Sequence, residues 1–123
     1  MNKINFFYPV LKGGLIPAST ILIANSHVDH LLISVNTGFI LDSNPVFYQY
    51  EIYVNNFLFA SKQQVSGFPE DPILGKHILN MTSNFTFDDV YAEVMYTFKI
   101  KLYKNNKEIE EAETTVFVAG GTQ

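Results

Sequence analysis

The sequence predicts an all-β protein, an antiparallel β-sandwich of about eight strands. Apolar and polar residues alternate with a period of two over much of the chain, as they do in strands that bury one face. No window of a dozen residues keeps the apolar spacing of an amphipathic helix. Turn compositions recur about every 8–12 residues. The length of 123 residues fits a single β-sandwich domain, residues 1–123.

The predicted strands are runs rich in aromatic and β-branched residues. In chain order they are Ile4–Leu11, Thr20–Asn25, Leu31–Asn36, Val46–Val54, Phe57–Gln63, Lys76–Met81, Glu93–Tyr103 and Glu108–Ala119. The segments between them contain glycine, proline, asparagine and aspartate, which favour turns. These segments include Gly13-Gly14, NSHVDH, Asn36-Thr37-Gly38, DSNP and SGFPEDP.

The pair Asn55-Asn56 predicts a two-residue type I′ turn, because asparagine tolerates the positive φ that both positions require. This turn pairs Val54 with Phe57, Ile52 with Phe59, Glu51 with Ala60 and Gln49 with Lys62. One face of the strand then carries a set of apolar residues that we expect in the core: Val46, Tyr48, Tyr50, Ile52 and Val54.

The second asparagine pair, in KNNKEIEEAE, leads to a different prediction. A two-residue turn would place Glu113 opposite Phe98, on the face that must be buried, and a buried unpaired carboxylate costs several kcal/mol. A three-residue loop, Asn105–Lys107, removes this conflict. It pairs Val94 with Val118, Tyr96 with Val116, Phe98 with Thr114, Ile100 with Ala112, Lys99 with Glu113, Lys101 with Glu111 and Thr97 with Thr115.

In this register the lysine and glutamate residues form a cross-strand ladder on the solvent face. Each pair contributes a few tenths of a kcal/mol, mainly toward fixing the register. The alternative is that the charges form an ionic docking strip for a partner.

The same register directs several large apolar residues outward, which predicts an interaction surface. Met95 pairs with Phe117, and Tyr103 pairs with Ile109, on the side of the charge ladder. So many outward aromatic residues exceed the scatter expected on a monomer. The expected interface residues are Met95, Phe117, Tyr103, Ile109, Phe47, Tyr53 and Leu58. The alternative is that the N-terminal segment NFFYPVL or a long loop covers them.

The stretches FTFDDVY and EVMYTFKIKLY, followed by the final hairpin, resemble immunoglobulin-like domains, in which an acidic turn leads into a Tyr-x-Phe strand. The resemblance covers about a third of the chain. The chain lacks the cysteine pair and the tryptophan of antibody domains. The resemblance therefore implies an immunoglobulin-like architecture in broad terms, and a superfold of this kind implies no function.

Composition argues against several classes of function. The chain has lysine but no arginine and a formal charge of -4, which argues against nucleic-acid binding. It has no cysteine, so it has no disulfide, thiolate metal site or thiol nucleophile. No apolar run approaches the roughly 20 residues that span a bilayer, and the N-terminus lacks a signal-peptide pattern. We therefore expect a cytoplasmic protein, or part of an assembly exported by another route, with no cofactor and no contact with membranes.

The segment NSHVDH raises the question of a metal site or a catalytic site. His27 and Asp29 would share one face of a strand while His30 would point the other way, so the three converge only in a loop. We expect no bound metal there. The acidic pairs Glu70-Asp71 and Asp88-Asp89 are predicted to lie in solvated loops without calcium, because no ligand spacing completes a site.

These observations favour a non-enzymatic interaction module that binds a protein partner or itself, in a homo-oligomer or in a bacterial or phage assembly. The alternative function is binding of a small ligand in an aromatic-lined cavity between the sheets. That cavity would use Tyr48, Tyr50, Tyr96 and Phe98. A third hypothesis is a hydrolase that uses His27 and Asp29.

Overall fold

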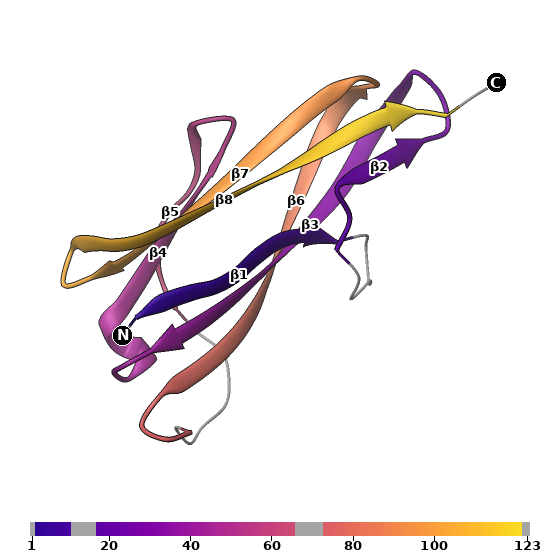
Figure 1. Cartoon of the computed structure of the whole chain (residues 1–123). Helices are drawn as coiled ribbons and strands as arrows, with labels where there is room; N and C mark the ends of the chain where they lie inside the picture. The colour runs from indigo at the N-terminus through magenta and orange to yellow at the C-terminus, as the bar shows by residue number, and fades with distance from the viewer. Residues whose placement is uncertain (1, 11–16, 66–72, 122–123) are drawn as a thin grey trace.

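The computed structural model describes residues 2–10, 17–65 and 73–121 and is built from eight strands in these ranges. The described residues contain no α-helix, and one 3-10 turn, η1 (Pro45–Phe47), precedes the fourth strand. The all-β prediction is therefore confirmed. The strands are β1 (Lys3–Val10), β2 (Thr20–Ile23), β3 (His27–Leu41), β4 (Tyr48–Val54), β5 (Phe57–Gln64), β6 (His77–Tyr91), β7 (Val94–Lys104) and β8 (Lys107–Gly120) (Figure 1).

The strands form two sheets, one of three strands in the order β1-β3-β6 and one of five in the order β2-β8-β7-β4-β5. Neighbouring strands are antiparallel except β2, which runs parallel to β8. The chain therefore changes sheet between β1 and β2, so that these two short strands follow one another along the side of the molecule (Figure 1). It changes sheet again between β3 and β4 and on either side of β6.

A single large core cluster contains side chains from both sheets. Phe39 and Leu79 of the three-stranded sheet and Phe98 and Ile100 of the five-stranded sheet belong to it, and all four are fully buried. The rings of Phe85 and Phe98, which come from different sheets, lie 5.0 Å apart. Burial of apolar surface between the two layers is the main stabilising contribution to such a fold.

The strands β3 and β6 are longer than the predicted Leu31–Asn36 and Lys76–Met81, since each has 15 residues. They pair with one another from His27–Tyr91 to Leu41–His77, so each strand satisfies most of the backbone groups of the other that face it. Three loop predictions are wrong for this reason: NSHVDH from His27 onward, Asn36-Thr37-Gly38 and Asp88-Asp89 all lie in strands. Glu70-Asp71 lies outside the described residues.

Gly38 lies inside β3 because an aromatic ring occupies the place of its side chain. A Cβ atom at Gly38 would lie 2.2 Å from the ring of Phe6. Phe6 is on the neighbouring strand β1, where its Cα partner is Gly38. A glycine within a strand often marks such a close approach of a neighbouring group. In the sequence, the same glycine contributed to the prediction of a turn at Asn36-Thr37-Gly38.

The β4–β5 hairpin confirms the predicted turn but not the whole register. Asn55 and Asn56 have φ of 50° and 68°, and Val54 pairs with Phe57. Register shifts on either side of Ile52 then pair it with Ala60 instead of Phe59, and pair Gln49 with Gln64 instead of Lys62. The predicted pairing of Glu51 with Ala60 is wrong for the same reason. Val46, expected in the core, lies in η1 and is exposed.

The β7–β8 hairpin confirms the predicted register by a different turn. Lys104 pairs with Lys107 across a two-residue turn, in which Asn105 and Asn106 have φ of 54° and 63°, so the three-residue loop is wrong. The predicted register needs one residue more than a two-residue turn provides. A bulge between Leu102 and Tyr103, where Ile109 has no partner on β7, supplies that residue. From Leu102 to Val94 all the predicted pairs are present, but Tyr103 pairs with Glu108 instead of Ile109.

Replacing Gly38 by alanine should destabilise the protein by about 1–3 kcal/mol, because the new methyl group forces the Phe6 ring off the sheet. Urea unfolding measures the change. The paired variant Gly38→Ala/Phe6→Ala is the control: because the two sites share one space, the combined loss should be smaller than the sum of the single losses. Strict additivity would contradict the assigned contact.

Candidate functional site

On the outer face of the five-stranded sheet, β7 carries lysines and the neighbouring strand β8 carries glutamates. Lys99 and Lys101 on β7 lie opposite Glu113 and Glu111 on β8, as the sequence predicted. The Lys99 ammonium lies 3.8 Å from the Glu113 carboxylate, whereas the Lys101 ammonium lies 3.4 Å from Glu108. The hydrogen bond to Glu108 is the main cause that raises the pKa of Lys101. These exposed ion pairs contribute little to stability, so their main effect is to fix positions on the face.

Next to this ladder, Glu51 holds two tyrosines of the same face. The hydroxyl of Tyr53 donates to Glu51 Oε1 at 3.1 Å, and the hydroxyl of Tyr103 donates to the same oxygen. The ammonium of Lys62 lies 4.4 Å from the centre of the Tyr103 ring, which is within cation–π range. Burial, followed by the hydrogen bond to Glu51, raises the pKa of Tyr103 and of Tyr53 above the ordinary value of tyrosine.

One end of the outer face is apolar. Leu22 on β2 is 74% exposed and Met95 on β7 is 60% exposed, while Phe117 on β8 is partly buried between their strands. The pairings of Phe117 with Met95 and with Thr20 place the three strands side by side at this point. We call Leu22, Met95 and Phe117 the apolar corner. Large side chains with this exposure are a common feature of protein contact sites when they are grouped.

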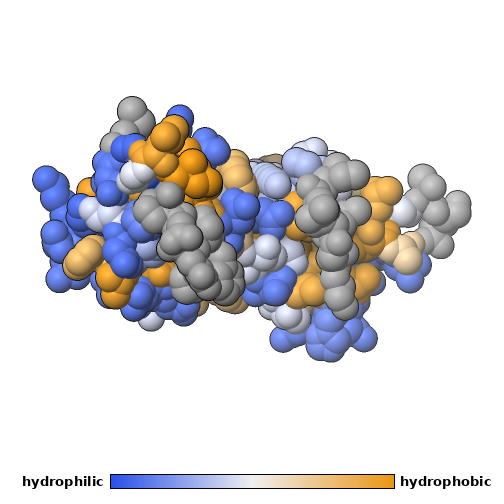
Figure 2. Space-filling model, turned by 90° about the horizontal axis from the view of Figure 1, so that it is seen from below, coloured by the Kyte–Doolittle hydropathy of each residue, from blue (hydrophilic) through white to orange (hydrophobic). Residues whose placement is uncertain are grey.

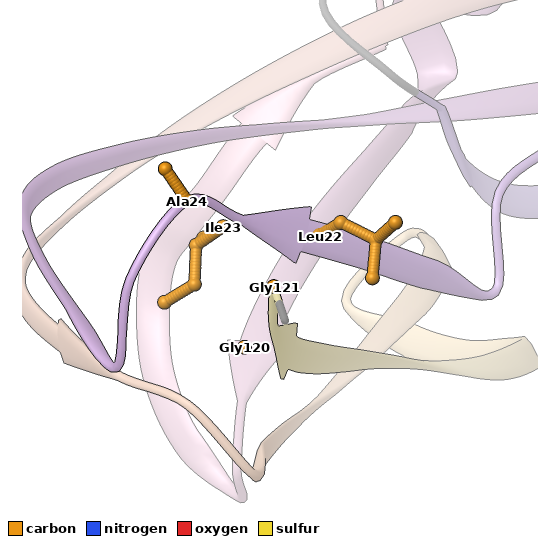
Figure 3. A pocket seen from close by; sticks show the side chains of 5 residues that line it. All are labelled: Leu22, Ile23, Ala24, Gly120 and Gly121. Atoms are coloured by element: carbon orange, nitrogen blue, oxygen red, sulfur yellow. The ribbon is translucent and has the colours of Figure 1, made fainter. Parts of the chain in front are cut away.

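An open hollow adjoins the apolar corner, where β2 ends beside the end of β8. It is lined by Leu22, Ile23, Ala24, Gly120 and Gly121. Figure 3 shows the side chains of Leu22 and Ile23 pointing in different directions from β2 next to the two glycines. In the view from below, hydrophobic residues reach the surface in separate patches interrupted by hydrophilic ones (Figure 2). The hollow is wide open to solvent and does not enclose a ligand, so it extends the apolar corner more than it forms a separate ligand site.

The other predicted interface residues are not all on this face. Leu58 pairs with Tyr53 and is half exposed on it. Phe47 is exposed and lies in η1, directly before β4. Ile109 does not lie opposite Tyr103 as predicted, because it packs against the core cluster beside the register shift of β7 and β8. Its place in an interface stays a prediction. Leu22 was not predicted, since the sequence gives no signal for the parallel pairing of β2 with β8.

The residues of the alternative ligand cavity lie in or against the core. Tyr48 and Phe98 are fully buried. The ring of Tyr96 stacks on Phe87 with a separation of 4.3 Å between ring centres, and the hydroxyl of Tyr50 donates to Gln63 at 3.1 Å. None of these residues lines the hollow beside the apolar corner. Their packing favours a role in the core.

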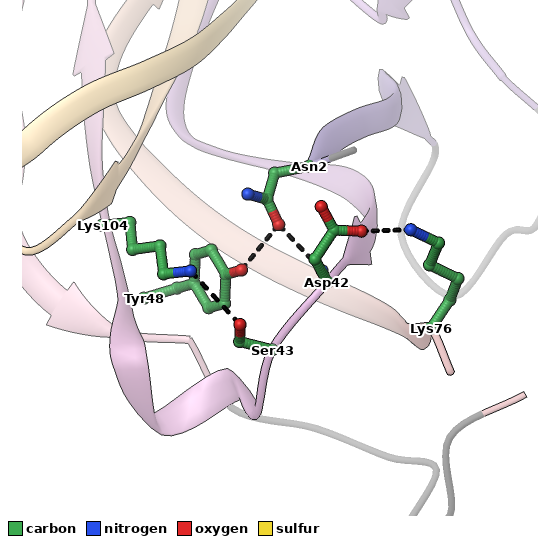
Figure 4. Close-up of polar contacts among 6 residues, drawn as sticks. All are labelled: Asn2, Asp42, Ser43, Tyr48, Lys76 and Lys104. Carbon is green, nitrogen blue, oxygen red and sulfur yellow. Dashed lines mark hydrogen bonds and ion pairs between the residues drawn. The ribbon is translucent and has the colours of Figure 1, made fainter. Parts of the chain in front are cut away.

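A polar cluster braces the end of the molecule where β3 leads into β4. Asn2 accepts hydrogen bonds from the hydroxyl of Tyr48 at 2.6 Å and from the backbone N–H of Asp42 at 2.8 Å. Lys76 forms an ion pair with Asp42, and this hydrogen bond is the main cause that lowers the pKa of the Asp42 carboxyl. Figure 4 shows that the six side chains come from segments far apart in sequence, which fits a structural brace: Asn2, Asp42, Ser43, Tyr48, Lys76 and Lys104.

A second polar cluster joins β3 and β6 near the start of β3. His27 Nδ1 lies 3.9 Å from Asp29 and Nε2 lies 3.4 Å from Asp89, and the three potential ligand atoms lie within 4.8 Å of one another. An imidazole with two carboxylates could hold a divalent cation. Asp89 was not predicted to join them, because the pairing of β3 with β6 brings it there. Exposed acidic groups are common without an ion, so this cluster alone carries no metal assignment.

His30 does not belong to that cluster. Its Nδ1 atom lies 2.7 Å from Asp88, which is its partner across the two strands. His27, Asp29 and His30 therefore do not converge, as expected for residues on a strand. The absence of a bound metal stays a prediction. In the described part of the chain, the ion-pair partners of the His27 ring are the carboxylates of Asp29 and Asp89. A hydrolase of the serine or threonine type would need a hydroxyl nucleophile beside the histidine, so these contacts do not support the hydrolase hypothesis.

Comparisons with protein-family models, with curated proteins and with solved structures gave no match for this chain. Within the described residues, no helix is long and apolar enough to cross a membrane. A candidate site must therefore be argued from the surface of the molecule itself. The best-supported candidate is the outer face of the five-stranded sheet with its apolar corner.

Replacing Tyr103 by phenylalanine should reduce the loss of stability at alkaline pH. Because the folded-state pKa of Tyr103 is raised above 10.0, its contribution to stability is complete below that value and is lost as the pH rises through the folded-state pKa. Urea unfolding at a series of alkaline pH values measures how steeply the free energy of unfolding falls with pH. Glu51→Gln keeps the size of the side chain and removes its charge, so it should make this fall partly less steep. Identical slopes in all three proteins would contradict the contact between Glu51 and Tyr103.

Proposed function

We propose that the protein is a non-enzymatic interaction module that contacts another protein chain through the outer face of β8, β7, β4 and β5. The chain would act in a homo-oligomer or as a small component of a bacterial or phage assembly. The observation that carries the proposal is the apolar corner, where Leu22 and Met95 are both well exposed beside Phe117.

The energetics of the corner support a contact. Burying an exposed leucine or methionine contributes about 1.5–3 kcal/mol at most. Further apolar contact would come from the rest of the partly buried Phe117 and from Leu58 on the other side of the face. The lysine and glutamate residues and the two tyrosines would then contribute polar and aromatic contacts of the kind found around the centre of protein interfaces.

The connectivity supports an immunoglobulin-like architecture for this module. In that superfold one sheet contains the first, second, fourth and fifth strands, and the other contains the third and the last two. The order β1-β3-β6 corresponds to the first, second and fifth strands, and β8-β7-β4 corresponds to the last two beside the third. β5 corresponds to an additional strand of variable-type domains, and no strand among the described residues corresponds to the fourth. The architecture alone implies no particular partner.

The proposal predicts that a photo-crosslinking amino acid at Met95 forms one defined adduct with a protein chain, identified by mass spectrometry, in extract of the source cell. The same amino acid at Leu74, which is 97% exposed on a turn away from the face, is the matched control and should give no defined adduct. Replacing Leu22 by aspartate should remove the Met95 adduct, because it places a charge in the corner, while leaving the unfolding midpoint unchanged. Equal yields at positions 95 and 74 would overturn the proposal.

A further inference from the structure

The charge pattern of the outer face is complementary to itself in one particular orientation. Four successive pairs face outward along β7 and β8: Met95 with Phe117, Thr97 with Thr115, Lys99 with Glu113 and Lys101 with Glu111. All the cations of these pairs lie on β7, and all the anions lie on β8. The two central strands therefore form one positive column beside one negative column.

From this pattern we propose that the partner is a second copy of the chain, packed face to face about a two-fold axis that runs parallel to the strands between β7 and β8. This inference rests on the proposed function of the same face. Such an axis exchanges the two columns and keeps each residue at its level along the strand. Lys99 of one copy then faces Glu113 of the other, Lys101 faces Glu111, and Met95 faces Phe117.

The other simple axes are disfavoured by the same charges. A two-fold axis perpendicular to the strands reverses the levels and keeps the columns, so that the lysines of β7 face lysines and the glutamates of β8 face glutamates. Like charges placed opposite one another in an interface cost several kcal/mol. An axis between β7 and β4 would pair Lys101 with Glu51 but would place Glu113 over Leu58, which leaves the Glu113 carboxylate without a cation from the other copy. Among these three, the axis between β7 and β8 is the one that pairs every charge of the two columns.

The strip that overlaps under this axis consists of β7 and β8, because β4 of one copy lies over the side of β2 in the other and β5 lies over no strand of the other sheet. Two strands spaced by about 4.8 Å, with β7 at 11 residues, give a strip of roughly 350 Å², less than half of the roughly 800 Å² per partner of a standard interface, so we expect a weak, concentration-dependent dimer. The apolar corner adds burial at one end, since Met95 and Phe117 of the two copies meet there. The ion pairs within each copy hold the charged groups in place before association.

Charge reversal tests the partner. Sedimentation velocity should show a concentration-dependent dimer for the wild type, and Lys99→Glu and Glu113→Lys should each weaken dimerisation by about tenfold or more. Mixing these two variants should restore a dimer, because every opposed pair then joins a glutamate to a lysine. Lys3→Glu, an exposed charge reversal on the three-stranded sheet, is the matched control and should dimerise like the wild type. Unfolding midpoints show that the variants are folded.

Cross-linking tests the axis, and it is straightforward because the chain has no cysteine. The proposed axis brings the two copies of residue 95 to the same end of the dimer, so Met95→Cys alone should be joined by a short bis-maleimide. A perpendicular axis would separate the two copies of residue 95 and bring Met95 near Tyr103. Cross-linking only in a mixture of Met95→Cys with Tyr103→Cys would therefore overturn the proposed axis.

The outcomes separate this inference from the proposed function. A wild type that stays monomeric at all concentrations, or a mixture of the two charge variants that stays monomeric, overturns the second copy as partner. If the Met95 photo-crosslink then identifies a different protein, the interaction face stands and its partner is that protein. If the Met95 crosslink also matches the Leu74 control, both proposals fail.

Discussion

The central position of β7 in the five-stranded sheet constrains the rest of the structure. Because β7 pairs with β8 on one side and with β4 on the other, its side chains can point only into the core or out from the sheet. Phe98, Ile100 and Leu102 are fully buried, so Lys99 and Lys101 must lie on the outer face. A shift of one residue in either neighbouring strand would place charged residues of that strand in the core.

This constraint explains why the register of the final hairpin could be predicted while its turn could not. The burial of Phe98 excludes a glutamate opposite it, and that requirement holds whatever joins the two strands. The extra residue that the register needs can lie in a three-residue loop or in a bulge after a two-residue turn. The asparagines adopt the two-residue turn, as Asn55 and Asn56 do in the other hairpin, and the bulge follows. Ile109 turns toward the core as a result, which alternation from the turn could not predict.

Sequence patterns gave the strands and the local hairpins but not the pairings between distant segments. Three features depend on the pairing of strands that are far apart in the chain. They are the contact of Asp89 with His27, the position of Leu22 beside Phe117, and the packing of the Phe6 ring over Gly38. Polar residues and a glycine in β3 and β6 suggested loops, because a turn and a long strand with a polar outer face contain the same residue types. Burial on the inner face of those strands, as at Phe39 and Leu79, decides between the two.

The charges at the centre of the outer face limit how strongly it can bind. Lys99 and Lys101 keep about a quarter of their side-chain surface exposed and already have carboxylate partners within the chain. An interface therefore gains little from forming these pairs and must pay for removing their water, whereas it gains apolar burial at Leu22 and Met95. In the proposed interface the charged centre would set orientation and partner choice, and the apolar corner would supply most of the affinity. Because orientation depends on charges, association through this face would weaken with ionic strength, while the fold, which depends on the buried side of β7, would not.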